Sequence, residues 1–373
     1  MRSNFKKVLL SILVGASILV PFKVESALLG WDLVDSGKHL DWDSNSKYIS
    51  IIDRSCGIWE NYRQGVIRRD SWSKLQDVFI SDYNEVSITL GVTSSRGTMK
   101  LNDYNFKNMT RDQRTKTVTH EFGHALGLDH TYGKYDVMQQ GMLSITSLSY
   151  TDKKSYDEAY RTYWYERKIC MNKMFNIKKI ISIILGLFIV LFTVSCNKEN
   201  IDNESKVIYM RGDFAVDVDS PYELVGYSDY YFIGEVISQK GTEYRDPIDV
   251  ETENGTEEVT SPYTNYEIKV IKNIKGNLPM NKNITITKAG GLSETGDLVL
   301  YEKDSLLDVG QVYVMTASAQ PDGSLLVSGP NSSEIFAQIT TQSSDTDVYD
   351  KFNDIYSNEV EFNRERFQFK DNK

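Results

Sequence analysis

The sequence predicts two domains of different class: an α+β domain in the first half of the chain and an all-β barrel or sandwich in the second. The length of 373 residues is sufficient for two domains. Residues 27–170 mix helical and strand-like patterns, whereas residues 197–373 contain short alternating runs punctuated by Gly, Asn and Asp. Charge divides the chain at the same place, because residues 197–373 carry 16 basic and 32 acidic residues, while the charges of residues 27–170 balance.

The overall composition excludes several classes of protein. Hydrophobic residues make up 40% and charged residues 25% of the chain, which is typical of globular proteins. A formal net charge of -10 argues against a general nucleic-acid binder, which needs a basic surface. Three cysteines are too few for a dense disulfide framework. All four histidines and all five tryptophans precede residue 171.

The first 26 residues have the pattern of a secretory signal peptide. Arg2, Lys6 and Lys7 precede an uncharged run of 15 residues from Val8 to Phe22. That run is too short to span a bilayer comfortably. Val24 and Ser26 would occupy positions -3 and -1 of a cleavage site before Ala27. We therefore expect residues 27–170 to be secreted.

A second export signal is predicted at residues 171–196. Three lysines precede an uncharged run that begins at Ile180 and includes Cys196. The sequence Thr-Val-Ser-Cys at 193–196 resembles the lipobox of bacterial lipoproteins, which implies that Cys196 is lipidated and anchors residues 196–373 at the cell surface. The alternative is a transmembrane helix near residues 180–196. Such a helix would have to insert against its charge bias, because lysines before an apolar run keep that end in the cytoplasm.

These signals suggest that two secretory proteins are joined head to tail near Cys170 and Met171. A fused or wrongly joined reading frame would produce this arrangement, and so would a genuine fusion. The expected segments are a signal peptide (1–26), a first domain (27–170), a second signal or membrane helix (171–196) and an acidic β-rich extracellular domain (197–373).

Residues 120–130, HEFGHALGLDH, have the pattern H-E-x-x-H-x-x-G-x-x-H. His120 and His124 are four residues apart, so on a helix they share one face and can reach the same metal ion. Gly127 can end the helix in a left-handed turn, which returns the chain and brings His130 back as a third ligand. Three His ligands leave the fourth zinc position for water, as in catalytic sites. Glu121 would then be the general base.

This pattern resembles the signature of the metzincin zinc peptidases. Thr131, after the third histidine, is closest to the Ser typical of matrixins, and the resemblance covers about residues 31–165. It implies a mixed twisted sheet with an active-site helix. It also implies that Met138 forms the Met-turn below the imidazoles, although simple core packing is an alternative role. A peptide substrate would add to the edge strand at Gly97–Leu101.

The resemblance also implies a pocket that holds the substrate residue after the cleaved bond. Gln139–Ile145 would form the wall of this pocket. Patterning in this domain predicts strands at Lys38–Trp42, Asp77–Ile80 and Val86–Val92, a helix that begins near Ser46 and a final helix at about Asp152–Trp164. Thr110 and Gln113 form a possible capping box at the start of the metal-binding helix.

Three other groups of residues could be metal ligands. Cys56 precedes a glycine, as does the latency cysteine of animal matrixins, but it falls on a core-facing stripe with Ile52 and Trp59, so we expect a buried structural cysteine. His39 is expected to be a surface or strand residue. Calcium is possible but unsupported, with residues 82, 84 and 85 (Asp, Asn and Glu) as weak candidates.

Residues 197–373 contain neither His nor Cys. Strands are predicted at Tyr231–Ser238, Tyr263–Ile271, Asn283–Lys288, Leu298–Tyr301, Gln311–Thr316 and Ser324–Val327, with a tether at Asn197–Lys206, an acidic loop at Asp246–Thr260 and a charged helix or tail at Asp345–Lys373. FIGEV, YEIKVIKNIKGN and GQVYVM weakly resemble OB-like netrin-type domains, which include tissue inhibitors of metalloproteinases.

Two functions are therefore expected side by side. The first half would be a secreted zinc endopeptidase acting on peptide or protein substrates. The second half would be a non-catalytic surface lipoprotein or binding module of bacterial type, with a role as partner of the protease as one alternative.

Overall fold

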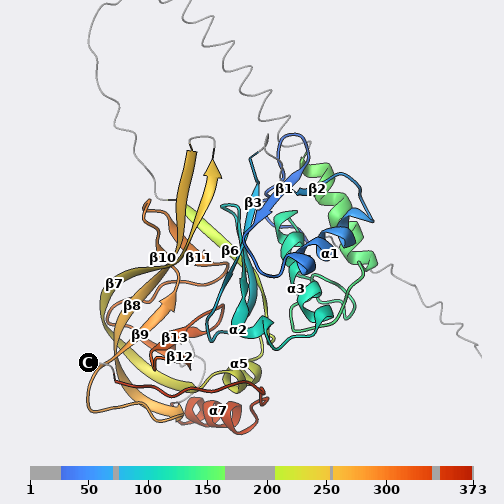
Figure 1. Cartoon of the computed structure of the whole chain (residues 1–373). Coiled ribbons are helices and arrows are strands. Elements are labelled where there is room, and N and C mark those ends of the chain that lie inside the picture. The colour runs from blue at the N-terminus through green and yellow to red at the C-terminus, as the bar shows by residue number, and fades with distance from the viewer. Residues whose placement is uncertain (1–26, 70–74, 164–205, 253–254, 338–344, 372–373) are drawn as a thin grey trace, which may run out of the picture.

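A computed structural model describes residues 27–69, 75–163, 206–252, 255–337 and 345–371. The chain is a mixed α/β protein with two sheets (Figure 1). Both predicted export signals, with Cys196, lie outside the described residues. Among the helices that are described, none is both long and apolar enough to cross a membrane.

The first sheet has eight strands in the order β10-β11-β6-β4-β5-β3-β1-β2 and mixes parallel and antiparallel pairs. Its first-half strands are β1 (Leu40–Ser44), β2 (Ile67–Arg69), β3 (Val78–Tyr83), β4 (Thr89–Ser94) and β5 (Thr98–Asn102). Its other strands are β6 (Val207–Phe214), β10 (Gly291–Leu292) and β11 (Leu298–Tyr301). The second half is therefore not fully separate, because three of its strands extend the sheet of the first.

Helices pack on the first-half strands. They are α1 (Ile49–Glu60), the short α2 (Asp103–Phe106), α3 (Arg111–Ala125) and a helix at residues 150–163. The predicted capping box starts α3, because Gln113 N–H donates to Thr110 Oγ1 and Thr110 N–H donates to Gln113 Oε1. The Trp59 indole on α1 donates to Thr119 O on α3 at 2.9 Å. These contacts fix α3 between α1 and the sheet.

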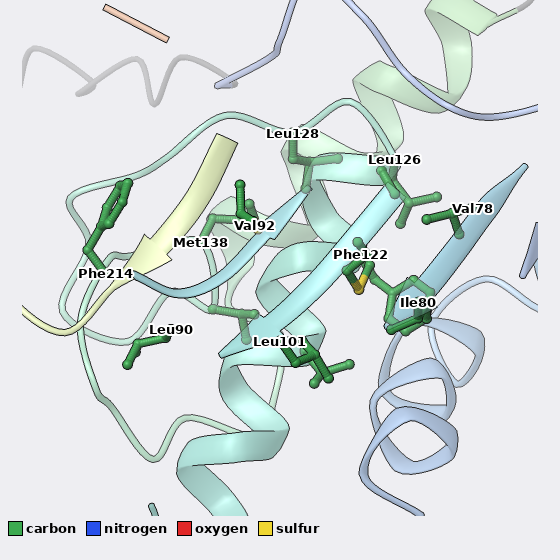
Figure 2. Close-up of a cluster of buried hydrophobic side chains, with 14 of the residues drawn as sticks. Val78, Ile80, Leu90, Val92, Leu101, Phe122, Leu126, Leu128, Met138 and Phe214 are labelled. Carbon is green, nitrogen blue, oxygen red and sulfur yellow. The ribbon is translucent and has the colours of Figure 1, made fainter. Parts of the chain in front are cut away.

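The core beneath α3 is apolar and continuous with the second half. Figure 2 shows Phe122 of α3 packed among side chains of the strands, with Phe214 of β6 at the margin. The same cluster of buried residues includes Tyr301 and Leu326 from the second half. The two halves therefore share one hydrophobic core.

The second sheet closes into a five-stranded barrel, which confirms the barrel prediction. The strands β13 (Leu325–Val327), β9 (Ile284–Ala289), β8 (Gly255–Lys275), β7 (Tyr230–Thr252) and β12 (Val312–Ala319) pair in that order, and β12 pairs back with β13. β14 (Ser333–Ile335) pairs with β12 outside the ring. Helices α5 (Pro221–Tyr227) and α7 (Asp345–Ser357) pack against this part.

Two predictions of local structure were wrong. Asp246–Thr260 is not a loop, because it continues β7 and β8 into a long ribbon in which Ile248 pairs with Val259 and Thr252 with Gly255. The β-branched residues of this stretch favour pairing even though acidic residues separate them. Gly97–Leu101 is not at an edge, because β5 lies between β3 and β4. Within the first half, β4 is the outer strand.

Candidate metal centre and cleft

Three histidine side chains converge at the end of α3. His120 and His124 lie one turn apart on the helix, and their ring centroids are 4.6 Å apart. The centroid of His130 lies 5.0 Å from that of His120 and 4.8 Å from that of His124. One nitrogen from each ring lies within 4.8 Å of the others, so the structure brings the three predicted ligands together.

The return of His130 depends on a left-handed turn at Gly127, as predicted. Gly127 has φ +85°, a conformation that glycine adopts without a Cβ clash. Its N–H donates to His124 O at 2.8 Å, and Leu128 N–H donates to Gly123 O at 2.9 Å. These bonds satisfy carbonyls at the helix end and direct the next residues back towards the helix.

Hydrogen bonds orient two rings through their Nδ1 atoms. His120 Nδ1 donates to Val137 O at 2.9 Å, and His124 Nδ1 donates to Leu128 O at 2.8 Å. This tautomer leaves each Nε2 with a free lone pair, as metal-binding imidazoles require. At the third ring, Gln140 Nε2–H donates to His130 Nδ1 at 2.9 Å, and His130 Nε2 faces Gly212 O at 3.1 Å and His124 Nε2 at 3.2 Å.

The histidine cluster is suited to a metal ion. His120 Nε2 is buried and has no hydrogen-bond partner among the described residues. Burial lowers the pKa of all three imidazoles, that of His124 to about 3, so the rings are neutral. A buried neutral imidazole with an unused Nε2, as at His120, is a ready ligand. Three converging imidazoles match the donor set of a catalytic zinc.

Met138 lies directly against the metal-binding helix and is fully buried. A Cβ on Gly123 would lie 2.3 Å from Met138 Sδ, so this close approach requires glycine. The carboxylate of Asp152 accepts from Val137 N–H at 2.9 Å and from Met138 N–H at 3.2 Å. Asp152 therefore holds the turn below the histidines. Sequence analysis missed this role, although the Ser149–Asp152 spacing is that of a helix cap, and Ser149 N–H also donates to Asp152.

Glu121 is buried beside the three histidines. Its Oε2 accepts from Thr93 Oγ1 of β4 at 2.7 Å, and its Oε1 accepts from Asp213 N–H of β6 at 2.9 Å. Burial raises the pKa of Glu121 to about 8. The carboxyl group thus lies between α3 and the paired strands β4 and β6.

Strand β6 from the second half lies beside the histidines, and its residues Arg211 and Gly212 line the same cavity as His130, which is called the cleft below. It pairs antiparallel with β4, so that Val92 is opposite Gly212 and Gly91 is opposite Asp213. The carbonyl oxygen of Gly212 is 3.1 Å from His130 Nε2. The neighbour of β4 on this side is therefore a strand of the same chain.

The other residues considered as ligands do not join the cluster. His39 lies beside Asp35, with 32% of its side chain exposed. Cys56 is buried in α1, as predicted, and burial raises the pKa of its thiol. The calcium candidates do not converge, because Asp82 binds Ser46 and Lys47 whereas Glu85 forms an ion pair with Arg245.

Three carboxylates, those of Asp35, Asp41 and Asp77, form a second cluster that the sequence did not reveal. Arg68 offsets its charge through two hydrogen bonds to Asp41, at 2.8 and 2.6 Å. Burial, together with the charges of Asp35 and Asp41, raises the pKa of Asp77 to about 6. A carboxyl group with a raised pKa favours the folded state only while it is protonated, so its contribution is lost as pH rises from about 4 through about 6.

Replacing Asp77 with asparagine is expected to stabilise the protein at pH 8 and to have little effect at pH 4. Asparagine keeps an oxygen that can accept from Asp41 N–H and removes the charge. The free energy of unfolding at pH 8 should rise by roughly 1 kcal/mol, a value reduced for partial exposure. Urea unfolding at both pH values measures this, with the exposed Asp43→Asn as control. An equal shift at both pH values would contradict the assignment.

No protein-family model matches the chain, and a search of curated proteins finds no similar sequence.

Proposed function

We propose that the first half of the chain is a zinc-dependent endopeptidase. The observation that carries this proposal is the convergence of three neutral imidazoles, two buried and one half-buried, beside the carboxyl group of Glu121. Nε2 of His120 has no hydrogen-bond partner among the described residues. The resemblance of residues 120–138 to metzincins supports the same function. The predicted signal peptide at residues 1–26 supports export.

Each residue of the cleft would have a separate role in peptide hydrolysis. His120, His124 and His130 would hold the metal, which when bound lowers the pKa of a water molecule and polarises a carbonyl group. Glu121 would take a proton from the attacking water and deliver it to the leaving amine. The edge of β4 that β6 occupies would, when free, align an extended substrate through main-chain hydrogen bonds.

Metal analysis of the secreted chain, residues 27–373, tests this proposal. We expect about one zinc per chain, the number that one three-histidine site holds. Removing it with a chelator should abolish any hydrolysis of casein, and adding zinc back should restore that hydrolysis. A folded protein without stoichiometric zinc would contradict the proposal.

A second function is favoured for residues 206–371, which would bind in the cleft of the first half. Strand β6 supports it, because β6 pairs with β4 and places Gly212 O against His130 and Asp213 N–H against Glu121. A peptide in this position would compete with substrate. We therefore propose that this half acts as an inhibitor or partner of the first.

We also propose that Cys196 carries a lipid and anchors the second half. The supporting observation is the basic and then apolar sequence that includes this cysteine. A chain expressed from Met171 should incorporate a fatty-acid analogue and enter the detergent phase, and Cys196→Ser should remove the label. An unlabelled wild-type protein that stays in the membrane would instead indicate a transmembrane helix.

A further inference from the structure

The cleft contains a pocket that encloses one carboxylate. The side chains of Asp213 and Lys116 are 0% exposed and form an ion pair at 2.9 Å. The second carboxylate oxygen accepts from Thr117 Oγ1 at 2.7 Å, and Gly141 N–H donates to the first at 3.1 Å. Three donors from α3 and from the loop after Met138 therefore surround the carboxylate of β6.

The pocket is unfavourable without an anion. Apart from Asp213, the Lys116 ammonium group contacts only the carbonyl oxygens of Gln139 and Gly141 among the described residues. A buried cation without a counter-charge is strongly destabilising, and removing one partner of such a pair typically costs about 3–5 kcal/mol. The first half thus contributes the buried cation of Lys116, and strand β6 of the second half contributes its ion-pair partner, Asp213.

The position of β6 relative to the histidines shows which of its peptide bonds lies next to them. Gly212 O lies 3.1 Å from His130 Nε2, and the next N–H, that of Asp213, donates to Glu121 Oε1 at 2.9 Å. The Gly212–Asp213 peptide bond therefore lies between the metal-binding nitrogens and the general base. Asp213 is the residue on the amine side of that bond.

The size of the residue on the carbonyl side of that bond, Gly212, is restricted as well. A Cβ added at Gly212 would lie 2.6 Å from Gly91 O, which is a backbone atom of β4 and cannot rotate away. Substrate backbone can approach β4 this closely only where it carries no side chain.

We propose that the protease selects Gly–Asp bonds, with Lys116 as the residue that recognises the aspartate. This rests on the proposed endopeptidase function. Water would form a C–O bond to the glycine carbonyl carbon, and the C–N bond to aspartate would break. The products are the glycine carboxylate and the ammonium group of aspartate, because the proton that Glu121 takes from water and the second water proton both go to the leaving nitrogen. Arg211–Gly212–Asp213 is a copy of such a substrate in the chain itself.

Peptide binding to a chain whose own aspartate is neutralised tests the pocket. The host is residues 27–373 with Asp213→Asn, which keeps the side-chain shape and weakens the hold on β6. The probes are labelled Met-Arg-Gly-Asp-Phe and Met-Arg-Gly-Asn-Phe peptides, and the readout is fluorescence anisotropy. We expect the Asp peptide to bind at least tenfold more tightly. Lys116→Met should remove this preference, whereas the exposed Lys107→Met should retain it.

Equal affinity for the two peptides, a folded host that binds neither, or a preference that survives Lys116→Met would overturn the inference. If Asp213→Asn does not fold, the wild-type chain serves as the host, and the Asp peptide should displace β6 more readily than the Asn peptide does. Product analysis by mass spectrometry separates the two proposals. A zinc-loaded host that prefers the Asp peptide but cuts neither would support the pocket and contradict the endopeptidase. Equal cutting of both peptides would contradict the pocket alone.

Discussion

Replacing His124 with alanine is expected to remove zinc and hydrolysis together, whereas Glu121→Ala should retain zinc and lose hydrolysis. His124 would supply one of three ligand nitrogens, whereas Glu121 contacts Thr93 and β6 and would move protons without holding the metal. Loss of a general acid–base group typically lowers the rate about 10²–10⁴-fold. Metal analysis and peptide hydrolysis in the Asp213→Asn host measure the two effects.

His39→Ala is the matched control, because His39 is the one histidine outside the cluster and lies partly exposed beside Asp35. It should change neither zinc content nor rate. A Glu121→Ala protein with near-normal turnover would show that another group carries the proton. A His124→Ala protein that still holds stoichiometric zinc would contradict the ligand assignment.

Replacing Asp213 with alanine is expected to destabilise the chain and to open its cleft. The substitution leaves Lys116 buried without its counter-charge, so the free energy of unfolding should fall by about 3–5 kcal/mol. Weaker docking of β6 should also raise the hydrolysis of added peptides above that of the wild-type chain. Denaturant unfolding and peptide cleavage, measured on the same preparations, test both effects.

Two further variants separate charge burial from general disruption. Asp217→Ala removes an exposed carboxylate three residues after β6 and should change neither stability nor rate appreciably. Adding Lys116→Met to Asp213→Ala removes the orphaned cation and should recover much of the stability. If the double variant were no more stable than Asp213→Ala, the ion pair would not be the source of the loss.

The histidine cluster could be predicted because its chemistry is local. Eleven consecutive residues contain all three predicted ligands and Glu121, and the helix and the turn at Gly127 alone bring them together. Asp152 was missed, because its contact with the turn at Val137 and Met138 depends on how the last helix packs.

The presence of β6 beside the histidines could not be predicted, since it depends on pairing between strands that are distant in the sequence. Val92 and Gly212 are 120 residues apart, and the sequence of β6 contains neither histidine nor cysteine to mark a site. The edge was misplaced for a similar reason. β4 and β5 are neighbouring strands of one hairpin, and only their pairing with β3 and β6 decides which lies outside.

The core that the two halves share affects what happens if the polypeptide is divided. Phe214 and Tyr301 pack with the apolar residues of the first half, and β6 is hydrogen-bonded to β4 along most of its length. If export processing cut the chain at Cys196, β6 would begin only eleven residues after the lipidated end. The shared core and the pairing of β6 with β4 would then hold the two fragments together, and a lipid on Cys196 would hold both of them at the membrane surface.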